Sequence, residues 1–477
     1  MDFEVTIGLE IHVEMKTKTK MFSATPVAFG AEPNTLTSPY DLAFPGVLPV
    51  PNKQAVINAI QVSHALHMKI DHELHFDRKN YFYSDLPKGY QITQNRRPIG
   101  SDGYLDIVVN GKNNRVEIER LHLEEDTAKQ LHFPNYTLID YNRAGIPLIE
   151  IVTKPCIHSS DVAAKYVETI REIVSFLGVS DGKMEEGQLR CDVNISLRKV
   201  GDKQYGTKVE VKNINSFNYI KIALEYEINR QKELLTKGEN IVQETRRYDE
   251  EHKSTQSMRL KTDSVDYKYF PDANIPIIKL SDEFINDAIK SSKELASAKR
   301  ERYQNEFKLN EYDTNILLSN IAIANYFDEC AKLSKHYKSI ANWIISDILA
   351  ILNKNALTID QFEIKPNHLI ALIEEIESGK ISNKIGREIF NYMINNHVDL
   401  KVAKEKLNVT SQESDDKKIR ALVIEVLDNN AQSIKDFHAG KDRALGFLIG
   451  QVMKKSGGKV NPSLTSKIMI EELNRRK

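Results

Sequence analysis

Cysteine is scarce in this chain, which has only three cysteines among 477 residues. Cys156, Cys191 and Cys330 are widely separated, so they supply neither a disulfide framework nor the paired cysteines of a zinc ribbon. Scattered free cysteines are typical of proteins in a reducing compartment. We therefore expect a cytoplasmic protein.

Long apolar segments and several common catalytic motifs are absent as well. No run of 18 apolar residues occurs, so no segment is expected to span a membrane. The acidic start, residues 1–15, lacks the basic region of a secretory signal. The sequence contains no Gly-x-x-x-x-Gly-Lys-Ser/Thr loop, no His-Glu-x-x-His, no Gly-x-Ser-x-Gly and no dinucleotide fingerprint. These absences argue against a Walker-type ATPase and against the other enzyme classes that these motifs mark.

Net charge is also nearly absent, because 66 Lys and Arg face 67 Asp and Glu. The two signs are nevertheless unevenly distributed. Residues 401–477 hold 16 basic and 10 acidic residues, and residues 1–400 hold 50 and 57. A basic tail on an acidic body suggests that the tail contacts a polyanion. A solvated helical domain whose excess charge has no function is the alternative, and it stays open.

The organisation of the chain changes near Ser281. Before this residue the sequence is strand-rich and punctuated by glycine and proline, and after it apolar residues repeat with helical spacing. The length suggests two to four domains. We predict an α+β protein: a cradle domain built on a mainly antiparallel sheet at 1–290, an all-α domain at 291–405 and a small, basic helical tail domain at 406–477.

Three segments of the first domain alternate between apolar and polar residues. They are residues 4–15, which place Glu10 and His12 on the polar face, residues 188–198 and residues 207–213. Such alternation predicts half-buried strands. Polar faces that mix carboxylates, amides and cations suit a sheet that binds Mg²⁺ and a charged ligand. A sheet with a merely solvated polar face has the same pattern, so both interpretations stay open.

Two further acidic sites are marked by their local sequence. Glu124 and Glu125 are followed by Asp126, and three successive acids are costly unless a cation offsets them or they point into water. Glu150 interrupts an apolar segment, where a buried glutamate needs a partner. Glu150 is therefore the best single candidate for a metal-binding or catalytic carboxylate. Isolated histidines such as His122 are expected to serve structure or solvent.

Ten long motifs, dispersed in order over the chain, carry a resemblance to a known family. They are IGLEIHVE (7–14), GVLPVPN (46–52), FDRKNYFYSDLPKGYQI (76–92), HLEEDTAK (122–129), IDYNRAGIPLIEIV (139–152), MEEGQLRCDVNISLR (184–198), VEVKNINSF (209–217), QETRRYDE (243–250), DYKYFPD (266–272) and RALGFLIGQVMKKSGGKVNP (443–462). Along essentially its whole length the chain resembles the B subunit of the aspartyl/glutamyl-tRNA amidotransferases. This resemblance is far more specific than the spacing arguments above.

The resemblance implies a ligase that forms carbon–nitrogen bonds with glutamine as amido donor (EC 6.3.5.-). In this family the B subunit uses ATP to phosphorylate the side-chain carboxylate of Glu or Asp on misacylated tRNA. Ammonia then displaces phosphate to give Gln-tRNA(Gln) or Asn-tRNA(Asn). A glutaminase (A) subunit supplies the ammonia, and a small C subunit completes the heterotrimer. Phosphoryl transfer needs Mg²⁺ and cations around the phosphates, so a polar sheet without a P-loop suits it.

The resemblance also implies roles for individual residues. The expected cation ligands form two groups, a catalytic group of His12, Glu125 and Glu150 and a neighbouring group of Glu10, Glu124 and Asp192. One imidazole among acids is compatible with Mg²⁺ or Mn²⁺. Some relatives carry a paired-cysteine zinc element, which three scattered cysteines cannot supply, so no structural zinc is expected. The residues expected on the ammonia path, or at the nucleotide site, are Lys79, Tyr81 and Lys88.

The resemblance further implies two sets of basic contacts. The residues expected at ATP or tRNA phosphates are Lys208, Lys212, Arg246, Arg247, Arg259 and Lys268. The tail is expected to bind tRNA by shape and phosphate through Lys441, Arg443, Lys454, Lys455 and Lys459. Two other hypotheses stay open: a tRNA-binding assembly module without chemistry of its own, and a metal-dependent phosphohydrolase that acts without tRNA.

Overall fold

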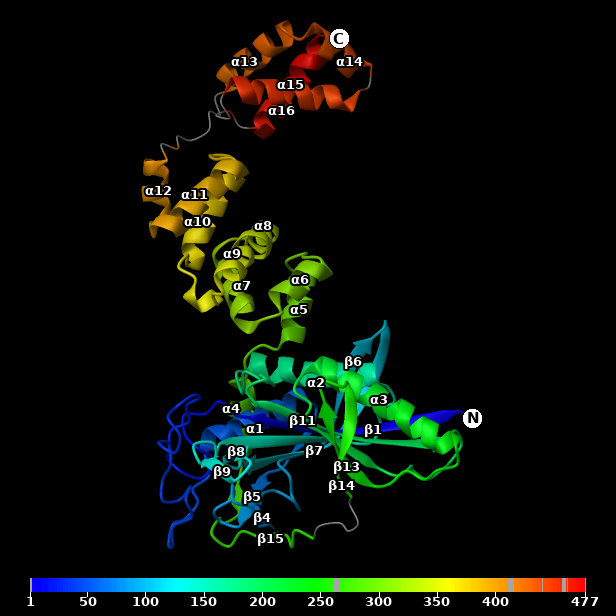
Figure 1. Ribbon diagram of the computed structural model, residues 1–477. Coiled ribbons are helices and arrows are strands. Elements are labelled where there is room, and N and C mark those ends of the chain that lie inside the picture. Colours follow the sequence, from blue (N-terminus) through cyan, green and yellow to red (C-terminus); the bar gives the residue numbers. More distant parts are fainter. Residues whose placement is uncertain are drawn as a thin grey trace. The chain divides into compact units, whose positions relative to one another are not determined.

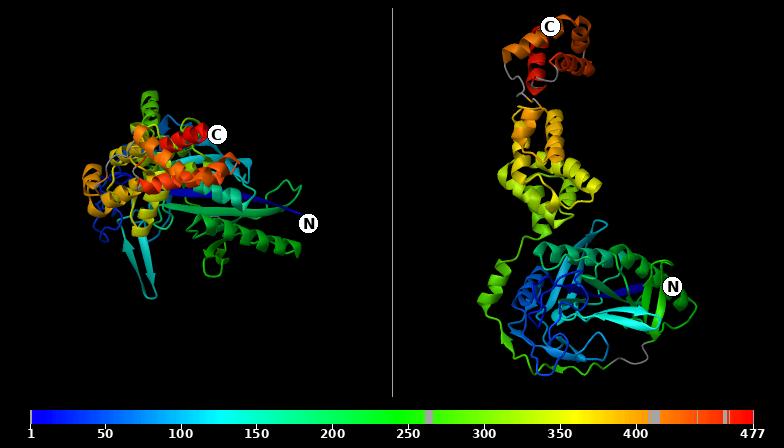
Figure 2. Two further views of the ribbon diagram at one scale, coloured as in Figure 1. Left: turned by 90° about the horizontal axis from the view of Figure 1, so that it is seen from above. Right: turned by 60° about the vertical axis from the view of Figure 1, so that its left-hand side comes forward.

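The computed structural model describes residues 2–260, 266–407, 409, 416–439, 441–456, 460 and 462–476 (Figure 1). The chain divides into two compact units, Met1–Ala296 and Ser297–Lys477. The first unit combines strands with helices, and the described elements of the second are helices (Figure 2). The α+β class predicted from the sequence is confirmed. Among the helices of the described ranges, none is both long enough and apolar enough to cross a membrane.

A nine-stranded sheet forms the centre of the first unit. Its strand order is β14-β13-β12-β11-β1-β10-β7-β6-β2, and β12–β13 is the parallel pair among otherwise antiparallel neighbours. The alternating segment at the N-terminus is thus the middle strand. The bounds are β1 (Phe3–Glu14), β2 (Lys69–Ile70), β6 (Gly100–Val109), β7 (Lys112–Glu125), β10 (Pro147–Thr153), β11 (Leu189–Lys199), β12 (Val209–Lys212), β13 (Glu244–Asp249) and β14 (Ser254–Leu260).

The two faces of this sheet differ in polarity because side chains alternate along each strand. The four apolar side chains of β1 from Ile7 to Val13 are at most 1% exposed. They share one hydrophobic cluster with α1 (Lys53–Ala65), α2 (Ser160–Leu177) and α3 (Phe217–Thr236). Burying each such side chain contributes about 1.5–3 kcal/mol. The helices therefore take the apolar face and leave the polar face to the site.

Three small sheets complete the first unit. The sheet that contacts the candidate site is β15-β4-β5, in which Asp77 of β4 pairs with both Pro271 of β15 and Thr93 of β5. Figure 1 shows α2 on one side of the central sheet and β4, β5 and β15 on the other. The bounds are β3 (Glu73–Leu74), β4 (Asp77–Asn80), β5 (Tyr90–Thr93), β8 (Lys129–Phe133), β9 (Tyr136–Asp140), β15 (Phe270–Pro271), β16 (Ile278–Lys279) and α4 (Asp282–Lys290).

The second unit is built from short helices. Its last four helices bury their own hydrophobic cluster, which includes Ile419, Val423, Leu448 and Met469. The boundary predicted between helical domains at 405 and 406 stays a prediction. The bounds are α5 (Ala296–Asn305), α6 (Glu311–Leu317), α7 (Ile321–Leu333), α8 (Tyr337–Asn342), a π-helical turn (Trp343–Ile348), α9 (Leu349–Asn355), a 3₁₀ turn (Ile359–Gln361), α10 (Pro366–Glu377), α11 (Asn383–Asn396), α12 (Leu400–Lys406), α13 (Asp416–Asp428), α14 (Ala431–His438), α15 (Asp442–Lys455) and α16 (Pro462–Arg475).

Candidate functional site

The polar face of the central sheet brings together side chains from three neighbouring strands. The register pairs His12 of β1 with Glu150 of β10, and Glu150 with His122 of β7, so these side chains share one face with Glu124. His12 Nε2 lies 3.4 Å from Glu150 Oε2 and 3.7 Å from Glu124 Oε1. We call His12, Glu124 and Glu150 the first acidic group. One ligand atom from each lies within 4.8 Å of the other two.

His122 closes this group on its other side. Its Nε2 lies 3.1 Å from Glu150 Oε2 and 3.6 Å from Glu124 Oε2, and its side chain is 6% exposed. His122 was expected from the sequence to serve structure or solvent, so its place in this site was not predicted. The sequence did offer one indication of this role. His122 and Glu124 stand two positions apart, so both side chains lie on one face of a strand.

The two imidazoles and the carboxylate of Glu150 shift one another's pKa values. Burial alone would lower the pKa of His12, but the carboxylate of Glu150, helped by Glu124, outweighs it and raises that pKa. Burial would likewise lower the pKa of His122, but Glu150 and Glu124 raise it to about 9. Burial would raise the pKa of Glu150, but His122 and His12 hold it well below its usual value. The carboxylate of Glu150 is therefore kept ionised, which is the form that binds cations.

A second acidic group lies on the same face. Glu10 of β1 pairs with Asp192 of β11, and Glu210 of β12 pairs with Asn194, two residues along β11. One carboxylate oxygen each of Glu10, Asp192 and Glu210 lies within 4.8 Å of the others. Asn194 Nδ2 donates to Glu10 Oε1 at 2.9 Å, and Thr245 Oγ1 donates to Glu210 Oε2 at 2.8 Å. The second acidic group is therefore oriented by neutral donors.

Lys212 places an ammonium group in the second acidic group. Its Nζ donates to Asp192 and lies 3.4 Å from Glu210 Oε1. Burial would lower the pKa of Lys212, but Asp192 and Glu210 raise it, so the side chain stays charged. Glu210 was not among the predicted cation ligands, although the alternation of residues 207–213 placed Lys208, Glu210 and Lys212 on one face of a strand.

Glu125 differs from the expectation that it binds a cation with His12 and Glu150. Successive side chains of a strand point to opposite faces, so alternation turns Glu125 away from Glu124. Its Oε1 accepts hydrogen bonds from Lys88 Nζ at 2.5 Å and from the backbone N of Ile92 at 3.1 Å. This is a correction, because Glu124 takes the place in the first acidic group that the sequence analysis gave to Glu125.

Lys88, Lys79 and Tyr81 lie in two different surroundings. Lys88 pairs with Glu125 and also donates to the hydroxyl of Tyr40 at 3.4 Å. The Nζ of Lys79 instead lies 4.8 Å from the ring centroid of Tyr267 and 5.9 Å from that of Tyr81. The side-chain contacts of Lys88 therefore differ from those of Lys79, and the role of all three residues on the ammonia path stays a prediction.

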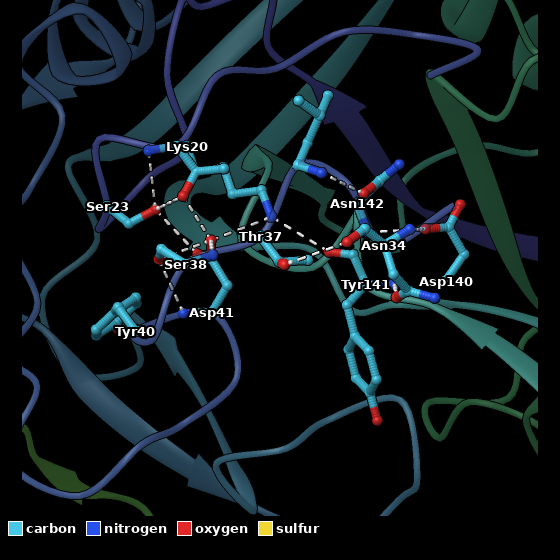
Figure 3. Close-up of polar contacts among 12 residues, drawn as sticks. Lys20, Ser23, Asn34, Thr37, Ser38, Tyr40, Asp41, Asp140, Tyr141 and Asn142 are labelled. Atoms are coloured by element: carbon cyan, nitrogen blue, oxygen red, sulfur yellow. Dashed lines mark hydrogen bonds and ion pairs between the residues drawn. The ribbon is translucent and has the colours of Figure 1, made fainter. Parts of the chain in front are cut away.

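A buried ion pair holds the loop that carries Tyr40. Lys20 Nζ lies 3.4 Å from Asp41 Oδ2, and both side chains are at most 1% exposed. Figure 3 shows Asp41 turned toward Lys20, Ser23 and Ser38, and the two serine hydroxyls each donate to the Asp41 carboxylate at 2.9 Å. Gly145 packs against this pair at φ +84°, where a side chain would be strained and would crowd both residues. The loop thereby presents Tyr40 to Lys88 in one defined position.

The residues expected at ATP or tRNA phosphates are scattered. Arg246 is nearly buried and pairs with Glu227 and Glu244, so it holds α3 to the sheet. Arg247 donates to Gln256 at 3.1 Å on the exposed side of β13. Lys208 and Lys268 are exposed. Arg259 belongs to β14, but its side chain lies outside the described residues.

The basic residues expected to bind tRNA in the tail have mixed surroundings. Lys441 pairs with Asp436 at 2.9 Å, and Lys455 pairs with Glu425. Arg443 and Lys454 are exposed on α15. Lys459 lies outside the described residues. Their role in tRNA binding stays a prediction.

Comparisons with known proteins agree with this fold. A family model described as the GatB/GatE catalytic domain matches residues 5–286, which include the nine-stranded sheet and both acidic groups. A second model, described as the GatB domain, matches residues 325–473. The sheet unit therefore belongs to a class of catalytic domain.

Full-length relatives define the family more closely. The chain is 47% identical to the B subunit of the aspartyl/glutamyl-tRNA(Asn/Gln) amidotransferase of Geobacillus thermodenitrificans over 478 residues, which cover 100% of both chains. It is also 47% identical to the corresponding protein of Persephonella marina, over 99% of this chain and 100% of that one. The chain belongs to the family of aspartyl/glutamyl-tRNA amidotransferase B subunits. The resemblance read from its ten motifs is confirmed.

Proposed function

We propose that this chain is the subunit that activates the amino acid in a tRNA amidotransferase. It uses ATP to phosphorylate the side-chain carboxylate of Glu on Glu-tRNA(Gln) or of Asp on Asp-tRNA(Asn). Ammonia then attacks the acyl phosphate, releases phosphate and leaves Gln-tRNA(Gln) or Asn-tRNA(Asn). The observation that carries the proposal is the pair of acidic groups on one sheet face, in a chain 47% identical over its full length to amidotransferase B subunits.

The two acidic groups fit divalent cations by the chemistry of their donors. Hard carboxylate oxygens with a single imidazole suit Mg²⁺ or Mn²⁺. His12, Glu124 and Glu150 would hold one cation, and the residues of the second acidic group would hold another. A bound Mg²⁺ supplies positive charge to the phosphate oxygens during transfer. His122 keeps the carboxylates of Glu124 and Glu150 in place for it.

Positive side chains beside the acidic groups would meet the phosphates of ATP. Lys212 already contacts the second acidic group. The charges of Glu124 and Glu150 act on Lys79, which lies near the first acidic group. Carboxylates alone repel a triphosphate, so these ammonium groups balance the charge of the complex. The exposed Lys208, Arg247 and Lys268 are assigned in this proposal to tRNA phosphates.

Lys88 and Glu125 are assigned to the ammonia path. A cavity of about 10 Å³ lies beside them, lined by Asp41, Asp85, Leu86, Pro87, Lys88, Glu125, Asp126, Ala144 and Gly145. Its volume is on the scale of one water-sized molecule, which is also the scale of ammonia. The ion pair between Lys88 and Glu125 forms one wall of this cavity.

The name of the relatives states that they are one subunit of a larger enzyme. We assign to this chain the same assembly, with a glutaminase A subunit that supplies ammonia and a small C subunit. The proposed place of action is the cytoplasm. The helices α13 to α16 would bind the tRNA body through phosphate contacts.

The test is ATP hydrolysis by the assembled complex with Glu-tRNA(Gln) and Asp-tRNA(Asn) supplied separately. At least one misacylated tRNA should stimulate hydrolysis, and Glu150→Gln should lower the stimulated rate by about 100-fold or more because a cation ligand is lost. Glu119→Gln is the matched control, since Glu119 lies on β7 with half of its side chain exposed. The proposal fails if neither tRNA stimulates hydrolysis or if Glu150→Gln retains the full rate.

A further inference from the structure

Four tyrosines from two distant segments form a row beside the first acidic group. The ring centroids of Tyr83 and Tyr81 are 6.1 Å apart, those of Tyr81 and Tyr267 are 6.0 Å apart, and those of Tyr267 and Tyr269 are 6.1 Å apart. Successive rings meet edge to face, at interplanar angles of 63° to 74°. We call Tyr81, Tyr83, Tyr267 and Tyr269 the aromatic ladder.

Strand pairing creates the ladder. Phe270 of β15 pairs with Arg78 of β4, so the segment before β15 runs beside the segment after β4 (Figure 1). The backbone N of Asn80 donates to the carbonyl oxygen of Tyr267 at 3.0 Å. The two motifs that contain these tyrosines lie far apart in the sequence, yet the fold joins them at one place.

The ladder does not serve a hydrophobic core. Tyr83 is 62% exposed and Tyr269 is 39% exposed, and Tyr81 and Tyr267 are half-buried. Neighbouring Phe82 is 88% exposed. Rings in a core are covered by other apolar groups, whereas exposed aromatic rings gathered at one place mark a binding surface. Aromatic faces of this kind accept a further planar ring by stacking.

Lys79 links the ladder to the first acidic group. Its ammonium lies over the ring of Tyr267 at 4.8 Å from the centroid. Strand pairing sets Lys79 opposite Gln91 and places Asp77 opposite Thr93, whose hydroxyl donates to Glu124 Oε2 at 3.4 Å. Lys79 therefore lies on the face of β4 and β5 that is turned toward Glu124. Burial would lower the pKa of Lys79, but Glu124, Tyr269 and Glu150 together outweigh burial and raise that pKa, which agrees with this proximity.

The order of these groups matches the order of groups in a metal-bound nucleotide. Aromatic rings come first, then an ammonium, then carboxylates that suit a divalent cation; in the ligand the base comes first, then phosphates, then Mg²⁺. We propose that the aromatic ladder binds the adenine ring of an adenosine nucleotide, with Lys79 on its phosphates. This assignment rests on the proposed ATP-dependent function and gives Lys79 and Tyr81 a nucleotide role instead of one on the ammonia path.

Adenine could reach the ladder from two sources, because ATP and the 3′-terminal adenosine of tRNA both carry the ring. The experiment therefore measures three affinities of the assembled complex: for ATP, for inorganic tripolyphosphate, and for tRNA with or without its terminal adenosine. The variants are Tyr267→Leu, which removes the ring, and Tyr267→Phe, which keeps it. Tyr312→Leu is the matched control, since Tyr312 is 71% exposed on α6 in the other unit.

We expect Tyr267→Leu to weaken ATP binding by about 5- to 100-fold, the usual effect of losing a stacked ring. Tyr267→Phe and Tyr312→Leu should stay near wild type, and tripolyphosphate should bind all variants alike. In wild type, tRNA with its terminal adenosine should then bind more tightly than tRNA without it. If Tyr267→Leu removes only this difference and leaves the affinity for ATP unchanged, the ladder binds the terminal adenosine of tRNA. Tyr83→Leu and Tyr269→Leu repeat the test at more exposed rings, in case Tyr267→Leu fails to fold.

The proposal is overturned if every folded variant among Tyr267→Leu, Tyr83→Leu and Tyr269→Leu keeps wild-type affinity both for ATP and for the terminal adenosine of tRNA. Failure of the proposed function has a different signature. In that case the wild-type complex would bind ATP through the ladder but would not hydrolyse it when misacylated tRNA is added.

Discussion

At the scale of single residues, the polar face is a balance of neighbouring charges. In the first acidic group, the carboxylate of Glu150 lies within 3.4 Å of the imidazoles of His12 and His122. In the second, the ammonium of Lys212 contacts the carboxylates of Asp192 and Glu210. A divalent cation entering the second acidic group must therefore compete with a cation that the chain itself supplies.

Replacing Lys212 by Met separates its two effects. We expect Lys212→Met to raise the affinity of the second acidic group for Mn²⁺ by about tenfold, because three carboxylates then lack their tethered cation. ATP should bind more weakly, because a phosphate partner is lost. Titrations with Mn²⁺ and with ATP measure the two effects. Unchanged or weaker Mn²⁺ binding would contradict this account of Lys212.

The residues of the site could be predicted from sequence only in part. Alternation along β1 correctly indicated that Glu10 and His12 share a face. The three successive acids at 124–126 could not be assigned to a face of the sheet from sequence. Either Glu124 or Glu125 could face His12 until the register of β7 against β10 was known. His122 and Glu210 were missed because their importance depends on partners from other strands.

At the scale of elements, a buried glutamate joins α3 to β13 and β14. Glu227 of α3 is fully buried and binds Arg230, Arg246, Gln231 and Thr255. Burial would raise its pKa, but the hydrogen bonds from Arg230 and Thr255 lower it below the ordinary 4.5. The contribution of ionised Glu227 to the free energy of unfolding is therefore fully present above about pH 4.5. This contribution is lost as the pH falls through the lower pKa that Glu227 has in the folded protein.

We expect Glu227→Gln to lower the free energy of unfolding by about 3–5 kcal/mol near neutral pH, because it leaves arginines buried beside a neutral partner. Below pH 4.5 the difference in the free energy of unfolding between wild type and variant should become smaller. Urea denaturation between pH 3.5 and 7 measures this difference. Glu233→Gln is the control, since Glu233 is exposed on the same helix. A gap that does not change with pH would contradict the assigned direction of the pKa.

The loop around Lys20 and Asp41 gives a second test at this scale. We expect Asp41→Ala to cost about 3–5 kcal/mol, because it leaves the buried Lys20 ammonium unpaired. The double variant Lys20→Met/Asp41→Leu should recover most of this loss, since it removes both charges. Thermal unfolding provides the measurement. A double variant less stable than Asp41→Ala would show that the charges are not the cause.

Elements were more predictable from sequence than loops. Strict alternation predicted the strand that became β1, and Pro366 and Gly379 bracket α10 as helix start and stop signals predict. The loop that holds Lys20 and Asp41 has no periodicity, so its buried ion pair could not be foreseen. The aromatic ladder was equally hidden, because it joins two segments that only strand pairing brings together.

At the scale of the whole molecule, the chain folds into two compact units. The sheet unit carries both acidic groups, and α13 to α16 bury a hydrophobic cluster of their own. The excess of basic residues in 401–477 was visible in composition alone. The functions predicted for the units came from long motifs, because charge and periodicity alone left other protein classes open.

Deleting residues 410–477 tests this division. We expect tRNA binding to weaken and its dependence on salt to become shallower, because phosphate contacts and the counterions they release are lost. Mn²⁺ and ATP should still bind to the remaining chain. Binding of tRNA to wild type and truncated protein across a salt series measures the change. An unaltered salt dependence would remove the tail from the tRNA interface.

Strand alternation places Glu124, and not Glu125, beside His12 and Glu150, and we propose that these three residues bind a divalent cation. The most direct measurement is to titrate wild type, Glu124→Gln and Glu125→Gln with Mn²⁺ and to monitor binding by electron paramagnetic resonance. We expect Glu124→Gln to weaken binding by about tenfold or more, while Glu125→Gln stays within about twofold of wild type. Loss of binding in Glu125→Gln with full binding in Glu124→Gln would contradict the account.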